Sequence, residues 1–479
     1  MRQIIKYIVL IIMVVVIHYE SNGQDSLSYY LEQAALYNPG VKSRYIEYSA
    51  ALEKVPQASS LPDPELQLGY LLKPMMLLGG NQVASVSVMQ MFPWFGTLKA
   101  SKDEASKMAL AKFESFLTAK NELFYNVKSS YYKLYRTIKE IEIAEKNLEI
   151  LHTLEKLALT KFRTGGTGSS QGMGGQMQSG TNMSSPGSTG MNNSSMSGQS
   201  NMGSGSMPSS QGSPAMSPGS GVMNGSMGAT GKDDMVNLLR VQIEIHDLEN
   251  RIALLRDQLV TDKVSFNRFL NRPLSADVFT ADSLSQTPVP LNIHELTDSL
   301  PNNPMVKMYQ AESEANRAKY DMATKMGYPM LGVGLNYMLI QKRDGNTSMM
   351  NGKDMKMPMV SLSLPIYRKK YKAMRNEAGL LRDAASQSEI DVLNNLQVNF
   401  QQALQNFNDA DRRVKLYTGQ ALLADKSVQL LITSYSSGGA DFVEVLRMQQ
   451  QLLDYQFKQV DAVVDKNTSI ARVVYLTGN

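Results

Sequence analysis

The sequence predicts a mixed α/β membrane protein built from two tandem copies of one unit, which consists of a helix, a β-hairpin, a long helix and a returning helix. Three observations predict this fold. Similar segments recur at a long and nearly constant offset. Each copy contains two short stretches in which apolar and small polar residues alternate. Each copy also contains a long stretch without proline, such as Leu98 to Phe162.

Composition excludes several classes of protein. The chain has 479 residues, no cysteine and a formal net charge of +4. Disulfides, thiolate metal sites and an acylated N-terminal cysteine are therefore excluded, and no Lys/Arg cluster suggests nucleic-acid binding. Arg2 and Lys6 precede an apolar run from Tyr7 to Ile17, which predicts a signal peptide over residues 1–23. An uncleaved membrane anchor is the alternative.

The repeat defines the domain organisation. Asn38-Pro39 returns as Asn303-Pro304, and the segment 161–166 (KFRTGG) returns as 434–439 (SYSSGG) at an offset of 273. Leu239–Gln242 then returns as Leu446–Gln449 at an offset of only 207. The difference of 66 residues is the length of the segment 167–232. We therefore expect a first repeat over 24–270 with an insertion at 167–232, a linker over 271–290 and a second repeat over 291–479.

Each repeat has the same expected elements. Asn followed by Pro predicts a helix start in both copies. Alternation predicts strands at about 64–73 and 82–92 in the first copy and at about 329–340 and 357–365 in the second. One face of these strands is apolar and the other is small or polar, which suits either a soluble sheet or a membrane barrel with an aqueous lumen. A long helix over about 98–163 follows the first hairpin.

These elements predict an oligomer. Four strands cannot close a barrel, and open strand edges are not tolerated in a membrane. Several copies of the chain must therefore share their strands. Three copies would give 12 strands, although strand geometry alone does not fix the number three.

The residues that carry these features resemble the TolC-type outer-membrane factors, and in particular the copper/silver efflux branch. The resemblance rests on the Asn-Pro helix starts, the paired VSV and VSL strands and two Gly-containing turns. It also includes the ending Leu476–Gly478. It implies a homotrimer whose 12-stranded outer-membrane β-barrel continues as a periplasmic α-helical barrel in a Gram-negative bacterium. It further implies a periplasmic membrane-fusion adaptor and an inner-membrane RND pump as partners.

The same resemblance implies a periplasmic tip at the two turns, where an adaptor docks and the channel is gated. The residues expected there are Phe162, Gly165, Asp234 and Arg240 in the first copy and Tyr435, Gly438, Asp441, Glu444 and Arg447 in the second. A layered acidic and basic gate is one interpretation. The alternative is a solvated helix start, because acidic residues favour helix N-termini in any case.

Methionine is concentrated in the insertion, which otherwise consists of Gly, Ser and other small or polar residues and is predicted to be a disordered tether. Its ten methionines are Met173, Met177, Met183, Met191, Met196, Met202, Met207, Met216, Met223 and Met227. A second cluster is expected in the loop of the second hairpin, with Met338, Met349, Met350, Met355, Met357 and Met359. Thioethers favour Cu(I) and Ag(I). The alternative is a neutral low-complexity spacer.

We therefore predict a passive outer-membrane exit duct of a tripartite efflux system that exports Cu(I) or Ag(I). The same channel serving drugs, small molecules or secreted proteins is one alternative, and a secreted coiled-coil structural protein is another. We expect no enzyme and no required cofactor, only transient Cu(I) or Ag(I) binding. The sequence has no Gly-rich phosphate loop and no HExxH motif.

Overall fold

A computed structural model describes residues 26–165, 230–284, 293–345, 347 and 349–478. The predicted signal peptide and nearly all of the predicted insertion lie outside these residues. The chain divides into a larger unit, Met1–Ile150 with His246–Asn479, and a smaller unit, Leu151–Ile245. The borders of these units fall within two helices and not at the linker 271–290, so most of both repeats belongs to one unit.

Both repeats contain the expected series of elements. In chain order these are α2 (Ser26–Tyr37), α3 (Pro39–Ser59), β1 (Glu65–Leu77), β2 (Gly80–Phe92), α4 (Thr97–Gly165), α5 (Thr230–Leu270), α6 (Ile293–Asp298), the 3-10 helix η1 (Leu300–Asn302), α7 (Pro304–Lys325), β3 (Met330–Gln341), β4 (Met355–Ser363), α8 (Arg368–Ser436) and α9 (Phe442–Thr477). Helix α5 begins at Thr230, slightly before the end predicted for the insertion. Strand β1 continues to Leu77, past the predicted residue 73.

The Asn-Pro helix starts are confirmed in both repeats. Asn38 caps α3 and Asn303 caps α7, with each side-chain oxygen accepting from backbone N–H groups of its own helix. The side-chain nitrogens reach further along the chain. Asn38 Nδ2 donates to the Phe269 carbonyl and Asn303 Nδ2 to the Leu476 carbonyl, both at 3.0 Å. In each repeat, the asparagine that caps the helix therefore also links the beginning of the repeat to its end.

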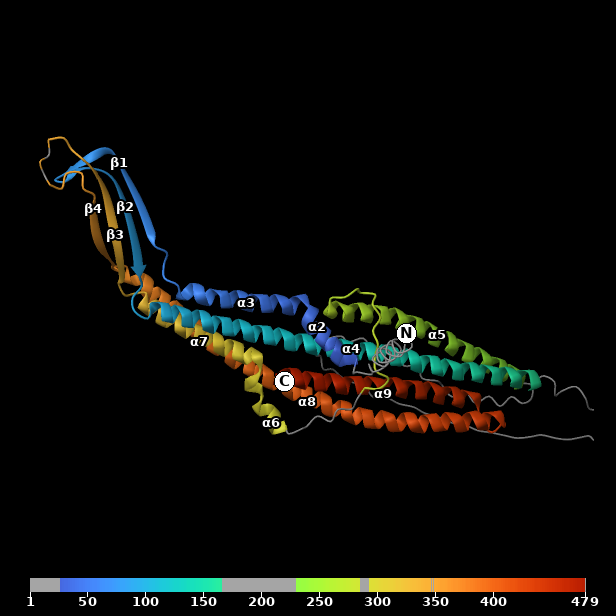
Figure 1. Cartoon of the computed structure of the whole chain (residues 1–479). Helices are drawn as coiled ribbons and strands as arrows, with labels where there is room; N and C mark the ends of the chain where they lie inside the picture. The colour runs from blue at the N-terminus through green and yellow to red at the C-terminus, as the bar shows by residue number, and fades with distance from the viewer. Residues whose placement is uncertain (1–25, 166–229, 285–292, 346, 348, 479) are drawn as a thin grey trace, which may run out of the picture. The chain divides into compact units, whose positions relative to one another are not determined.

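The four strands form one antiparallel sheet in the order β1-β2-β3-β4. Because β2 of the first repeat pairs with β3 of the second, the sheet joins the two hairpins. Within the larger unit the sheet lies at one end, and α3, α7 and α8 extend away from it (Figure 1). A register shift interrupts the pairing of β1 with β2 between Tyr70 and Met75.

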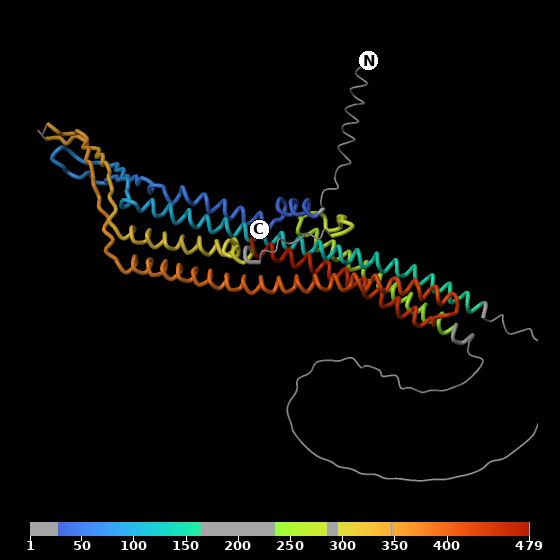
Figure 2. The backbone as a smooth tube through the Cα atoms, turned by 90° about the horizontal axis from the view of Figure 1, so that it is seen from below, coloured from blue at the N-terminus to red at the C-terminus, as the bar shows by residue number. Residues whose placement is uncertain are grey.

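Helices account for most of the described chain. Helices α4 and α8 have 69 residues each, which at a rise of 1.5 Å per residue corresponds to about 100 Å. Within the larger unit, α8 packs against α7 and α9, and α7 follows the first part of α8 (Figure 2). No described helix combines the length and the apolar character that a membrane span requires.

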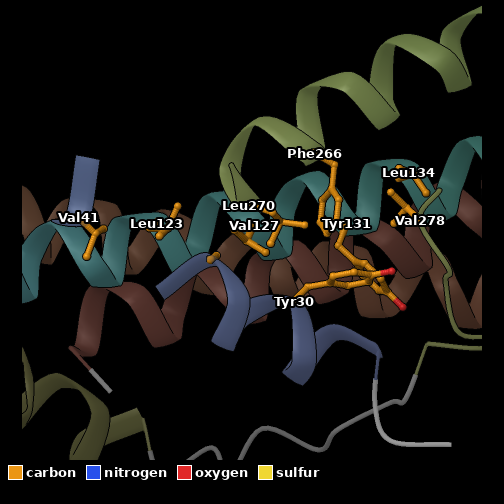
Figure 3. Close-up of a cluster of buried hydrophobic side chains, with 10 residues drawn as sticks. Tyr30, Val41, Leu123, Val127, Tyr131, Leu134, Phe266, Leu270 and Val278 are labelled. Carbon is orange, nitrogen blue, oxygen red and sulfur yellow. The ribbon is translucent and has the colours of Figure 1, made fainter. Parts of the chain in front are cut away.

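The main apolar cluster of the larger unit combines α2, α3, α4, α5 and the start of the linker (Figure 3). Tyr30 meets Phe266 edge to face at a centroid distance of 5.0 Å, and Tyr131 lies beside both. The two tyrosine hydroxyls also accept from the linker backbone, from Phe279 N at 3.0 Å and Ala281 N at 2.9 Å. The first part of the linker is therefore packed against the helices.

A buried polar cluster connects the two repeats within the larger unit. Asn147 on α4 donates to Gln456 Oε1 on α9 at 2.8 Å, and Gln449 Nε2 donates to Asn147 Oδ1 at 2.6 Å. Asn147 and Gln449 are both buried. Because an unpaired buried amide is costly, this arrangement favours one axial register between α4 and α9.

Candidate functional site

The sheet has two chemically different faces, and the pairing register shows which residues share each face. The apolar face carries large side chains on every strand, namely Leu66, Leu68, Val86, Val88, Leu331, Val333, Leu335, Val360 and Leu362. The polar face carries Gln67, Ser85, Ser87, Gly332, Gly334, Asn336 and Ser361. Most of the apolar side chains are exposed, with Leu68 at 73%. A lone chain leaves this apolar face uncovered.

Aromatic residues follow the strands at the end of the sheet nearest the helices. Trp94 stacks on Tyr328 at a centroid distance of 5.6 Å, and Phe95 lies beside Trp94. Tyr367 is exposed just before the basic start of α8, which includes Lys369. Aromatic rings next to cationic side chains are typical of the boundary between membrane and water.

The methionines predicted for the hairpin loop are found in two different places. Met349 and Met350 lie in the loop between β3 and β4 and are exposed. Met338 instead lies on β3, and Met355, Met357 and Met359 lie on β4, so their assignment to the loop was wrong, although the strand expected from about residue 357 already included Met357 and Met359. Strand β4 begins earlier than predicted, because its methionines alternate with Lys356 and Pro358 and continue the pairing with β3. The three methionines of β4 lie on the polar face.

The turn between α8 and α9 is closed by the backbone and by an aromatic contact. Gly438 has φ +86°, a conformation that favours glycine. The Gly439 amide donates to the Ser434 carbonyl at 2.8 Å, which gives the helix end of a Schellman motif. Tyr435 and Phe442 are buried, with their rings 5.2 Å apart. The short turn therefore has a small apolar core of its own.

The charged residues predicted at this turn lie on its solvent side. The Asp441 side chain accepts from Val443 N at 3.3 Å and caps α9. Glu444 and Arg447 are exposed, one helical turn apart on α9. This cap supports the interpretation of Asp441 as a helix start. A gating role for Glu444 and Arg447 stays a prediction.

The corresponding residues of the first repeat lie at the ends of α4 and α5 in the smaller unit. Phe162 is 36% exposed, Gly165 is the last residue of α4 and Arg240 is exposed on α5. Asp234 lies on α5, but its side chain is outside the described part of the structure. The helices of the smaller unit are linked by Gln242 Nε2, which donates to Glu155 Oε1 at 3.0 Å.

Across the described residues, no group of three or more His, Asp or Glu side chains could hold a metal ion. The ten methionines of the insertion lie outside these residues. Sequence reasoning also missed two methionines on the polar face, Met89 and Met91 of β2. Their signal is the alternation of Met with Gln90 and Phe92.

An electrostatic cluster links α4 and α9 in the larger unit. Burial, followed by the nearby Asp461 carboxylate, raises the pKa of Glu140, although Arg136 and Arg251 oppose the shift. Arg136 forms ion pairs with both Glu140 and Asp461. On the exposed side of α4, hydrogen bonds from Lys139 and Lys146 lower the pKa of Glu142 to about 2. The ion pair of Arg136 with Asp461 links α4 to α9, whereas Lys139, Glu142 and Lys146 pair with one another along α4.

Comparison with known proteins identifies the fold. Residues 296–479 match the family model described as outer membrane efflux protein. A search of curated proteins gives no match.

Several solved structures are similar over 95% of the chain. The outer-membrane channel OprN has 14% identity, 90% of its chain covered and a TM-score of 0.67. For VceC of Vibrio cholerae these values are 11%, 96% and 0.66, and for CusC they are 12%, 92% and 0.67. At such low identity the likeness concerns the fold, and it confirms the predicted combination of a small antiparallel sheet with long helices.

Proposed function

We propose that the whole chain is the passive outer-membrane channel of a tripartite efflux system, because residues 296–479 match the outer membrane efflux protein family model. One observation carries the proposal: the sheet exposes an apolar face on all four strands, while the opposite face combines small and polar residues with methionines. That pattern suits strands with lipid on one side and water on the other.

Closure of the barrel requires further copies of the chain. In the described chain β1 and β4 each have one neighbouring strand, and unpaired strand edges are not tolerated in the bilayer. Three copies would contribute 12 strands and bring β1 of one copy beside β4 of the next. The exposed aromatic side chains of Trp94, Phe95 and Tyr367 would then form the belt at the periplasmic boundary of the membrane.

The long helices account for the periplasmic part. Helix α8 would span about 100 Å from the membrane boundary to the turn at Gly438. A periplasmic membrane-fusion adaptor would dock near this turn, and an inner-membrane RND pump would supply the energy. A secreted coiled-coil protein accounts for neither the two-faced sheet nor the family match.

The proposed cargo is Cu(I) or Ag(I). The segment 167–232 carries ten methionines and no His, Asp, Glu or Cys. Thioethers favour soft monovalent cations over Zn(II) or Ni(II). The rival function is the same channel serving drugs or other small molecules, with the segment as a neutral spacer.

The test uses an efflux-dependent strain that lacks its own copper and silver exit duct. In one variant the segment Thr167–Lys232 is deleted. In a second, all ten of its methionines are replaced by serine, so that length and charge are unchanged. We expect both variants to form detergent-stable trimers and to lower copper and silver tolerance, while drug tolerance stays equal to wild type.

Each result decides a different part of the proposal. Unchanged metal tolerance in the methionine-free variant contradicts the metal role and leaves the channel. Failure of the wild-type chain to form heat-modifiable, detergent-requiring trimers contradicts the channel itself.

A further inference from the structure

Methionines gather on the polar face of the sheet, where a water-filled barrel usually has charged or hydroxyl groups. The register places Met89 and Met91 of β2, Met338 of β3 and Met355, Met357 and Met359 of β4 on this face. A methionine that only filled apolar space would be expected on the opposite face, which is mostly apolar and has Gln90 and Lys356 as its polar members. The thioethers therefore require another explanation.

Two glycines on β3 open a lane between these methionines. Gly334 pairs with Met89 on one side and with Met359 on the other, and Gly332 lies between Met91 and Ser361. Strands two positions apart are about 9–10 Å apart. Two flexible methionine side chains can bridge this distance when the residue between them has no side chain. A Cβ at Gly332 would lie 2.6 Å from Met91 Sδ and closer still to Ser361 Oγ, so both the sulfur and the hydroxyl already reach over the glycine.

The sulfur atoms converge on one hydroxyl group. Ser361 Oγ lies 3.3 Å from Met89 Sδ and 3.6 Å from Met91 Sδ. The two sulfurs are therefore at most 6.9 Å apart, the sum of these two distances. Small rotations of two unbranched side chains would bring both onto a single ion at the position between them.

An oxygen without a partner lies next to this cluster. Asn336 follows Gly334 on the same face of β3, between Ser87 and Met357. Its Oδ1 atom is buried and has no hydrogen-bond partner among the described residues. A buried carbonyl oxygen without a donor is costly, and a cation is one of the few groups that would satisfy it. On β1, Glu65 pairs with Met89 and adds a carboxylate to the same row.

The geometry points to a binding site for a soft monovalent cation, Cu(I) or Ag(I), in the lane over Gly332 and Gly334. Met89, Met91 and Met359 would supply thioether sulfur, and the oxygens of Ser361 and Asn336 would lie in reach. This inference deepens the proposed function, because it rests on a metal cargo and places a second thioether site inside the barrel, separate from the segment 167–232. Neutral thioether ligands suit a conduit, since an ion must be held and then released.

The test measures methionine oxidation residue by residue in the full-length protein in detergent. Hydrogen peroxide converts accessible thioethers to sulfoxides, and a thioether bound to Ag(I) is shielded from it. At a free Ag(I) concentration about ten times the dissociation constant, oxidation of Met89, Met91 and Met359 should slow by about tenfold, because only the unoccupied fraction reacts. Met75 and Met76, on β1 past the register shift, should oxidise at an unchanged rate.

Matched variants provide a second measurement. Equilibrium dialysis should show one Ag(I) fewer per chain for the double variant Met89→Leu/Met91→Leu and no change for Met75→Leu/Met76→Leu. Equal Ag(I) binding by both variants, or unchanged oxidation of Met89 and Met91 at saturating Ag(I), overturns the inference. If the methionines of the segment 167–232 are then still protected by Ag(I), the proposed metal cargo stands without the barrel site.

Discussion

The two turns that end the long helices differ, although the repeat makes them equivalent in sequence. In the second repeat Tyr435 is 4% exposed and Phe442 is fully buried. The corresponding residues of the first repeat, Phe162 and Met235, are 36% and 42% exposed. Both pairs are large and apolar. Residue type therefore does not decide burial at these positions.

Chain connectivity explains the difference. In the second repeat only six residues separate Tyr435 from Phe442, and Gly438 and Asp441 direct the chain from one helix into the next. In the first repeat the same two positions are separated by a segment that includes the 66-residue insertion. The helices below each turn still have buried apolar residues, such as Ile245 and Leu452. Because buried apolar residues of the helices themselves hold the helix pair together, the turn of the first repeat can accommodate a long insertion.

The largest predicted effect tests this difference in burial. Phe442→Ala removes a fully buried ring that packs on Tyr435 and should lower the local free energy of opening by about 3–5 kcal/mol. The matched change Met235→Ala in the first repeat should cost no more than about 0.5 kcal/mol, as at other surface positions. Hydrogen exchange of the amides flanking each turn measures both. Equal losses in the two variants would show that the turns are energetically alike.

A smaller effect is expected from the backbone of the closed turn. Gly438 has φ +86°, so Gly438→Ala should destabilise the turn by about 1–2 kcal/mol. Gly419 lies within α8, and a Cβ there would meet no atom within 4 Å. Gly419→Ala should stabilise the same helix by about 0.5–1 kcal/mol. Exchange of the Gly439 amide, which bonds to Ser434 O, should become faster only in the first variant. A stabilising Gly438→Ala would contradict the turn geometry.

Much of the fold could be predicted from the sequence because its signals are local. The Asn-Pro pairs at Asn38 and Asn303 mark helix starts. The strands alternate apolar and polar residues, whereas the long proline-free stretches have apolar residues at helical spacing. Residues 296–479 match the outer membrane efflux protein family model, and the likeness to OprN and CusC confirms the predicted combination of a small antiparallel sheet with long helices. The added tie from each asparagine to a distant carbonyl was not predictable, because it requires knowledge of which helix ends meet.

The candidate sites were less predictable because they depend on long-range register. Met355 precedes the strand expected from about residue 357, because a run of Met and Lys has no strong strand signal. Only the strand register brings Met89 and Met91 beside Ser361, and no local pattern in the sequence indicates this contact. The buried contact between Asn147 and Gln449 was missed for a related reason. On a helix, a polar residue in the core has the same sequence signature as one on the surface.

The smallest predicted effect tests whether the closed turn depends on ion pairs that lie further along the same two helices, away from the turn. Asp411 on α8 accepts from Lys415 and from Lys466 of α9, each at 2.8 Å. These hydrogen bonds lower the pKa of Asp411 below its ordinary 3.8. The folded state therefore holds this proton less tightly than the unfolded state. The resulting stability is present above the ordinary pKa and is lost as pH falls through the lowered value.

Because the pair is partly exposed, Asp411→Asn should cost less than about 1 kcal/mol near neutral pH. The loss should shrink toward zero in acid, where the wild-type carboxylate is itself protonated. Asp454→Asn, which removes an exposed partner of Lys458 on α9, serves as the matched control and should have almost no effect. Thermal unfolding of the detergent-solubilised protein across this pH range measures both variants. If the Gly439 amide exchanged faster in Asp411→Asn, the closed turn would owe its order to this distant ion pair and not to the contact between Tyr435 and Phe442.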